Sequence, residues 1–262
     1  MLLSQPEVTV ARTAAEAIEG FGDGTDVTVV AGGTIVTPLV WNGRLRPGRA
    51  LLLAPSALGG LDDGETALTV GATVSLARLA EVAPEPLASA AGIPDPEIRG
   101  QATVGGNLHV AGDLQPALLA LGARVRSAGA GGERVEPVAD YLARLRGEPR
   151  LVLSLEVERP LAGAWVEQRR RHSHTATVLT VAVARRQDGV HVAVGSLGEL
   201  RPAVTCPSVE RALAAGASPR EAADAVADDV DAEDDSLASA WYRKRVLPVL
   251  VARALARLEE GT

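Results

Sequence analysis

The chain has 262 residues, of which 47% are hydrophobic and 2% aromatic, and its formal charge is −7. This length predicts one large domain or two smaller ones, with a core built from Val, Leu and Ala. The acidic balance argues against a nucleic-acid-binding protein, which would present a basic face. No apolar run approaches the ~18 residues that a membrane span needs.

The first residues lack the charged and apolar regions of a signal peptide, and Cys206 is the single cysteine. One cysteine can form neither an internal disulfide nor a cysteine-ligated iron–sulfur cluster within this chain. We therefore expect a cytoplasmic protein.

The first fifty-odd residues predict a small unit of strands and helices. A helix begins at Thr13, where Glu16 completes a capping box. Residues 27–31 are typical of a short buried strand, and residues 35–41 continue the apolar pattern as a helix. A second strand at 50–54 ends in a turn.

A second unit follows, with a strand at 66–72 and a helix at 75–82. Asp113 or Gly112 caps a further helix whose leucines recur at helical spacing. Strands at 123–127 and 151–157 complete this unit.

Residues 160–163 are the best candidate for a linker. Beyond them, three strands are predicted at 164–166, 177–184 and 190–194. Three helices come next: one at 207–214, one that opens at Ser218 with a proline at N1 and a glutamate at N3, and one at 237–259 that is kinked or broken near Pro248. Strands followed by helices favour an α+β domain.

Two glycine doublets lie about seventy residues apart, Gly32-Gly33 and Gly105-Gly106. Without a β-carbon, the backbone can turn its N–H groups toward an anion, including in conformations with positive φ. Hydroxyl groups of Thr34 and Thr103 and the amide of Asn107 add donors. A helix that begins near Ile35 would point its positive end at a phosphate.

Each doublet alone is more often an ordinary strand-to-helix turn. The chain has neither a Gly-x-Gly-x-x-Gly after its first strand nor a Gly-Lys-Ser/Thr, so a Rossmann site or a P-loop is unsupported.

The residues around the doublets carry a family resemblance. The matching segments, in order, are 30–34 with Pro38-Leu39, 98–108, 113–121 with its Asp-x-x-Pro-Ala pattern, and 240–245 with its Tyr-Arg pair, followed by 253–255. They resemble the FAD-binding (medium) subunit of the xanthine dehydrogenase and carbon monoxide dehydrogenase family of molybdenum hydroxylases. The resemblance spans nearly the whole chain.

This resemblance implies an α+β fold with two domains. Residues 1–162 would form a two-lobed FAD-binding domain of the PCMH type, with lobes at about 1–55 and 56–162. Residues 163–262 would form a smaller C-terminal α+β domain, with a three-stranded antiparallel sheet plus helices. FAD would lie between the lobes, with its pyrophosphate on both glycine loops.

The resemblance also implies the cofactor contacts. In the first glycine segment these are Ala31, Gly32, Gly33, Thr34 and Ile35. In the second they are Thr103, Val104, Gly105, Gly106 and Asn107. Asp113 corresponds to an acidic residue near the cofactor, and Val152 to an apolar residue beside the isoalloxazine.

Two departures from the family pattern affect the isoalloxazine end. The stretch between Asn107 and Asp113 is about three residues shorter than usual. Near residues 165–176 the usual lysine is missing around Val166-Glu167, and His174 stands where an aspartate is usual; Arg169 or Arg170 would replace the lysine. A positive group at the pyrimidine edge stabilises reduced flavin, so this change bears on the flavin's potential.

Other polar residues have competing interpretations. His109, just after the second doublet, either faces the flavin or is a loop histidine without a catalytic role. His172 and His174 share a face if extended, yet nothing close completes a metal site, so a solvated edge is favoured. The acidic run 228–235 fails the calcium-loop pattern and favours a solvated loop. We expect no metal.

Three functions follow as alternatives. The first is an electron-transfer subunit: a molybdenum-cofactor large subunit oxidises the substrate, an iron–sulfur small subunit passes electrons to FAD, and FAD passes them to NAD, quinone or oxygen. The second is a stand-alone FAD-dependent oxidase or dehydrogenase acting on a small molecule. The third is a degenerate scaffold subunit without catalysis.

Overall fold

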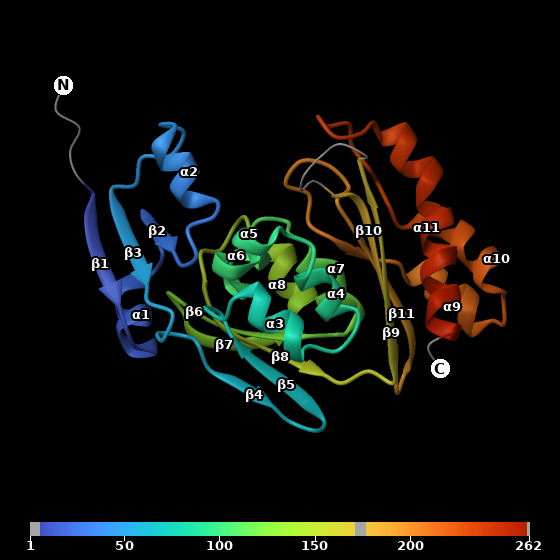
Figure 1. The fold of residues 1–262 in the computed structure, drawn as a ribbon, viewed down its shortest axis with the longest axis horizontal. Helices are drawn as coiled ribbons and strands as arrows, with labels where there is room; N and C mark the ends of the chain where they lie inside the picture. Colours follow the sequence, from blue (N-terminus) through green and yellow to red (C-terminus); the bar gives the residue numbers. More distant parts are fainter. Residues whose placement is uncertain (1–5, 171–176, 261–262) are drawn as a thin grey trace.

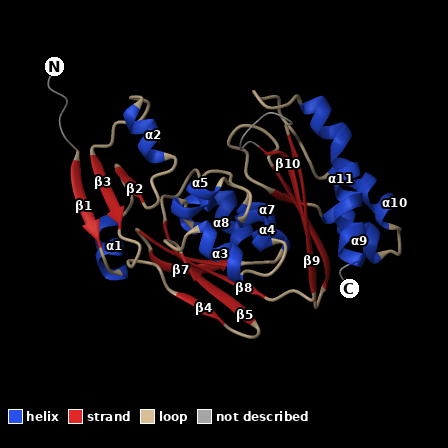
Figure 2. Ribbon diagram, viewed as in Figure 1, coloured by secondary structure: helices blue, strands red, loops and turns tan. Residues whose placement is uncertain are grey.

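The structure is a computed structural model that describes residues 6–170 and 177–260. In these residues three sheets follow one another along the chain, each accompanied by its own helices (Figures 1 and 2). In the part of the chain that the structure describes, no helix combines the length and apolar character needed to cross a bilayer.

The first sheet is parallel, with the order β1-β3-β2. Its strands and helices are β1 (Glu7–Ala11), α1 (Ala14–Phe21), β2 (Val27–Val30), α2 (Val36–Trp41) and β3 (Arg49–Leu53). Thr13 caps α1 as predicted, because its hydroxyl oxygen accepts the Glu16 N–H. The Glu16 carboxylate accepts the N–H of Arg12, one residue before the cap, so the predicted capping box is displaced by one residue.

The second sheet is antiparallel, with the order β4-β5-β8-β6-β7. Its strands are β4 (Leu61–Asp63), β5 (Ala67–Gly71), β6 (Arg124–Gly129), β7 (Gly132–Pro137) and β8 (Leu151–Glu158). The helices of this unit are α3 (Leu76–Val82), α4 (Leu87–Ala91), α5 (Pro96–Gln101), α6 (Val104–His109), α7 (Leu114–Ala120) and α8 (Val138–Arg144). They gather on the side of the sheet that faces the other two units (Figure 1).

The third sheet is antiparallel and contains one more strand than predicted, with the order β12-β11-β10-β9. Its strands are β9 (Ala162–Arg169), β10 (Thr177–Arg186), β11 (Gly189–Gly195) and β12 (Val204–Thr205). The strand β12 has two residues, too few to produce a hydrophobic pattern. The outer face is covered by α9 (Pro207–Ala214), α10 (Pro219–Asp224), the 3₁₀ helix η1 (Ala225–Asp228) and α11 (Ala240–Glu260).

Strand β10 is buried on both faces. Leu179, Val181 and Val183 pack into a core under the C-terminal helices, whereas Ala182 and Ala184 join the core of the first two units. The small side chains on that second face let β10 lie against α7. The third sheet is therefore packed on the middle unit.

Two expectations about the C-terminal part need adjustment. The proposed linker 160–163 lies where the second sheet ends and the third begins, but its last two residues belong to β9, and a β-carbon on Gly163 would lie 2.1 Å from the Glu85 carbonyl oxygen. Helix α11 begins at Ala240, three residues later than predicted, and is not broken at Pro248. The capping box at Ser218 and Glu221 is present as predicted.

The acidic run 228–235 is largely exposed to solvent, as predicted, but Asp229 and Asp235 within it also make structural contacts. Arg243 on α11 is 1% exposed, and its guanidinium contacts the Asp235 carboxylate at 2.7 Å. The same guanidinium donates to the backbone carbonyls of Val178, Glu233 and Ala238. Although burial opposes it, hydrogen bonds from the Ala238 N–H, the Arg243 guanidinium and the Leu237 N–H lower the pKa of Asp235. Arg243 thus ties α11 to the acidic run and to β10.

Replacement of this arginine is expected to destabilise the chain strongly. Arg243→Ala leaves a carboxylate and three carbonyls without their donor, so we expect the free energy of unfolding to fall by about 3–5 kcal/mol. Urea denaturation measures this change. Arg245→Ala, which removes an exposed guanidinium stacked on Trp241, is the control and should cost less than about 1 kcal/mol. Equal losses in the two variants would contradict the anchoring role.

Candidate cofactor-binding site

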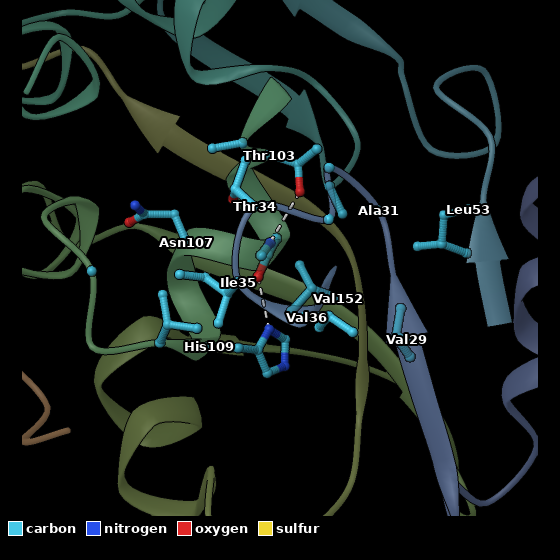
Figure 3. A pocket seen from close by; sticks show the side chains of 18 of the residues that line it. Val29, Ala31, Thr34, Ile35, Val36, Leu53, Thr103, Asn107, His109 and Val152 are labelled. Carbon is cyan, nitrogen blue, oxygen red and sulfur yellow. Dashed lines mark hydrogen bonds between the residues drawn. The ribbon is translucent and has the colours of Figure 1, made fainter. Parts of the chain in front are cut away.

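Both glycine doublets line one cavity of about 680 Å³. This volume lies in the range of cofactor pockets, about 300–1,000 Å³. The wall is formed by β2 and the segment after it, by α5 and α6, and by β8 with the segment before it. The side chains that point into this space are largely apolar (Figure 3).

The predicted contacts converge on this cavity with one exception. Ala31 to Ile35, Thr103, Gly105, Gly106, Asn107, Asp113 and Val152 all belong to its wall. Val104 does not, and its side chain is fully buried in the core. Its contact with the cofactor stays a prediction.

The first doublet lets two distant segments touch. A β-carbon on Gly32 would lie 1.9 Å from the Gln101 carbonyl oxygen and 3.1 Å from the Ala102 Cα. Gly33 has φ +70°, a conformation that residues with side chains rarely adopt. Gly32 thus brings the segment after β2 against the end of α5, and Gly33 turns the chain into α2.

The segment after β2 carries free backbone donors. The N–H groups of Gly32, Gly33, Thr34 and Ile35 have no acceptor in residues 6–170 and 177–260. Successive N–H groups at a turn with a left-handed residue form a concavity that binds anions. This run of donors beside the cavity is suited to a phosphate group.

The second doublet differs from the prediction. It lies within the helix α6, and its N–H groups already donate to acceptors of the protein. The N–H of Gly105 donates to the Ala72 carbonyl at 2.9 Å, and that of Gly106 to the Thr103 hydroxyl oxygen at 3.3 Å. A β-carbon on Gly105 would lie 2.9 Å from the Ala72 β-carbon, whereas one on Gly106 would meet only the Thr103 hydroxyl. Gly105 therefore permits α6 to pack closely against Ala72. Gly106 leaves the cavity wall flat, because no side chain projects from it into the cavity.

Asn107 takes the capping role that the sequence assigned to Asp113 or Gly112. Its side-chain oxygen accepts the N–H of Leu114 at 3.1 Å, at the start of α7. Gly112 leaves room for this amide, since a β-carbon there would lie 2.3 Å from the Asn107 oxygen.

The Asp113 carboxylate accepts the Thr177 hydroxyl of β10 at 2.8 Å. Burial raises the pKa of Asp113 to about 6, helped by the nearby Glu167 carboxylate and opposed by the Thr177 hydrogen bond and by Arg169. Through this hydrogen bond, Asp113 connects the cavity wall to the third sheet. With a pKa of about 6, its carboxyl group changes charge near neutral pH.

The region of the missing lysine is only partly described. The Glu167 carboxylate accepts the Trp165 indole N–H at 2.5 Å and the Arg169 guanidinium at 2.8 Å. Arg169 also reaches the carbonyl oxygen of Ile93, a residue of the cavity wall, at 3.5 Å. The departure at His174 and the proposed pair of His172 and His174 lie outside the described residues. In residues 6–170 and 177–260 no group of three metal-ligating side chains occurs.

Sequence reasoning missed the apolar wall of the cavity. Phe21, Val27, Val29 and Leu53 line it, together with Pro149 and Arg150. Strand β2 was expected to be buried, but its four residues are only partly covered, and two of them, Val27 and Val29, face this space. An apolar strand that no other element packs against would have indicated a cavity here. Whether another element packs on a strand cannot, however, be read from one sequence.

The sequence matches the family described as the FAD binding domain in molybdopterin dehydrogenase over residues 4–157. The chain belongs to this family. It binds FAD, and the free donors and the cavity volume fit a dinucleotide cofactor. A search of curated proteins found no significant match.

Solved structures show the same fold over the whole chain. This protein matches a chain of carbon monoxide dehydrogenase from Hydrogenophaga pseudoflava with TM-score 0.83 and 22% identity. The match covers 100% of this protein and 99% of that chain. Reconstituted CO dehydrogenase from Oligotropha carboxidovorans gives 0.85 and 19%, covering 100% of both chains. Quinoline 2-oxidoreductase from Pseudomonas putida 86 gives 0.82 and 17%, covering 100% and 99%.

Substitution of Gly106 tests the flat wall of the cavity. Gly106→Val places a branched side chain in the cavity with little other obstruction, so we expect a stable fold and an FAD affinity lower by about 100-fold or more, equivalent to about 2.7 kcal/mol. Isothermal titration with FAD measures the affinity. Gly100→Ala, where a β-carbon meets nothing within 4 Å, is the control and should bind like the wild type. Unchanged affinity in Gly106→Val would refute this placement.

The raised pKa of Asp113 predicts a pH effect on the FAD-free chain. Because the folded pKa of about 6 exceeds the ordinary 3.8, the folded chain binds more protons in this window and its stability falls as the pH rises from 4 to 6. Asp113→Asn keeps an oxygen for Thr177 and removes this loss. The variant should gain up to about 3 kcal/mol over the wild type between pH 4 and pH 7. Urea denaturation at both pH values checks it, with the exposed Asp140→Asn as the control.

Proposed function

We propose that this chain is the FAD-binding electron-transfer subunit of a heteromeric dehydrogenase of the molybdenum hydroxylase type. The observation that carries the proposal is the run of free N–H groups at Gly32–Ile35 beside a cavity of dinucleotide size. The fold shared with chains of carbon monoxide dehydrogenase and quinoline 2-oxidoreductase supports it. FAD, when bound, accepts and releases electrons.

In this proposal the chain's own residues bind and orient the cofactor. The N–H groups of Gly32 to Ile35 hold the diphosphate, with Thr34 and Thr103 beside it. The apolar residues of β2, with Ile35 and Val152, exclude water from the cavity. Asp113 places an ionisable carboxyl at the edge that meets the third sheet.

In this proposal electrons enter from another protein and leave to a separate acceptor. A single cysteine, buried at the start of α9 with its thiol pKa raised by burial, cannot hold an iron–sulfur cluster. We therefore propose an iron–sulfur small subunit as the electron donor, a molybdenum-cofactor large subunit as the site of substrate oxidation, and NAD, quinone or oxygen as the acceptor.

The domain division is also a proposal. Residues 1–162 would form the FAD-binding domain, with lobes at about 1–55 and 56–162, and residues 163–262 the C-terminal domain. The three sheets support this division, because the first ends at Leu53, the second spans Leu61 to Glu158, and the third begins at Ala162.

A second candidate function is a stand-alone FAD-dependent oxidoreductase, favoured by an exposed imidazole, His109, in the cavity wall. One experiment separates the two. The purified chain is loaded with FAD and mixed anaerobically with a reduced iron–sulfur subunit of a molybdenum hydroxylase, and the flavin absorbance is followed. Bleaching that requires the partner supports the proposal. Bleaching by a small-molecule substrate alone supports the second candidate, and a chain that takes up no FAD contradicts both.

A further inference from the structure

His109 is the one imidazole of the cavity wall in residues 6–170 and 177–260, and both of its ring nitrogens are engaged. Nδ1 lies 2.7 Å from the Gly105 carbonyl oxygen, one turn earlier on α6. Nε2 lies 2.9 Å from the Tyr141 hydroxyl on α8, and the two rings meet edge to face with centroids 5.9 Å apart. The ring is therefore fixed at the cavity wall (Figure 3).

These partners accept either protonation state of the imidazole. A carbonyl oxygen can only accept, so Nδ1 carries a hydrogen in both states. In the neutral ring, Nε2 accepts the Tyr141 hydroxyl. In the charged ring, Nε2 donates to that oxygen, and the Tyr141 hydroxyl turns to the Arg150 carbonyl oxygen at 3.4 Å. A proton can thus be added at Nε2 without leaving a buried donor or acceptor unsatisfied.

Few other groups at the cavity change charge near neutral pH. Burial raises the pKa of Tyr141, so its hydroxyl stays neutral. Hydrogen bonds from Arg134 and Arg150 lower the pKa of Glu148, so its carboxylate stays charged. The Arg150 guanidinium is bound to Ser127, Gly132 and Glu148. Asp113 is the remaining ionisable group in the described wall.

We propose that His109 is an FAD-binding residue that takes up a proton when the cofactor binds, so that its imidazolium balances the diphosphate charge while its nitrogens stay on Gly105 and Tyr141. The proton comes from solvent and adds to Nε2, since the ring is exposed in the cavity. The proposal rests on this cavity being the FAD site. An FAD diphosphate brings two negative charges into a space with few charged side chains, so an added cation strengthens binding.

The sign of the pH dependence follows from linkage. Bound FAD favours the charged imidazole, so we expect the affinity for FAD to be greater in acid and to fall as the pH rises. Histidine side chains titrate in the range pH 5–8. Asp113 acts in the same direction, because its carboxyl loses its negative charge in acid. The two contributions therefore have to be separated by variants.

Calorimetric titration of the full chain with FAD, in two buffers of different ionisation enthalpy, counts the protons taken up per FAD between pH 5.5 and pH 8. His109→Asn retains an amide donor for the Gly105 carbonyl and cannot titrate. His109→Gln retains a contact for Tyr141 and serves if the first variant is unstable. Asp113→Asn isolates the contribution of His109, and ADP-ribose is the probe that carries the same non-titrating diphosphate diester without the flavin.

We expect Asp113→Asn to take up protons with both FAD and ADP-ribose, and its FAD affinity to rise on the order of tenfold from pH 8 to pH 5.5. The double variant with His109→Asn should bind FAD without proton uptake and with a flat pH profile. Uptake that persists in the double variant, or that is absent in Asp113→Asn while FAD still binds, overturns the proposal. A wild-type chain that binds no FAD contradicts the proposed function instead.

Discussion

The site depends on a single steric constraint, the contact between the backbone of Gly32 and the carbonyl of Gln101. A β-carbon on Gly32 would lie 1.9 Å from that oxygen, so only a residue without a β-carbon fits at this position. This contact joins the first sheet to the helices of the second, and the cavity lies where they meet. The free N–H groups that follow Gly32 are consequently held beside α6 instead of on a separate loop.

Sequence reasoning was most successful where a local pattern determines a local structure. The caps at Thr13 and Ser218 and the short strands follow from residues that are neighbours in the chain. Both glycine doublets lie in the wall of one cavity, and membership of the FAD-binding family is confirmed. The different roles of the two doublets were not predictable, because these roles depend on Ala72 and Gln101, which are distant in sequence from Gly105 and Gly32.

Two of the differences from the sequence predictions share a physical cause, namely the choice of hydrogen-bond partner. Asp113 has the residue type of a helix cap, but Asn107 reaches Leu114 and leaves the carboxylate to Thr177 on another sheet. The acidic run has the composition of a solvated loop, yet Arg243 is buried against it. In each case a tertiary partner more than five residues away decides the role, and one sequence carries no signal for it.

The strand order of the second sheet has a consequence for biosynthesis. Strand β8 lies between β5 and β6, although it is the last of the five in the chain. A nascent polypeptide cannot complete this sheet until residue 158 has been synthesised, and Val152 of the cavity wall arrives with the same strand. Pairings of such long sequence separation form slowly. The cavity wall is therefore incomplete until β8 has paired with β5 and β6.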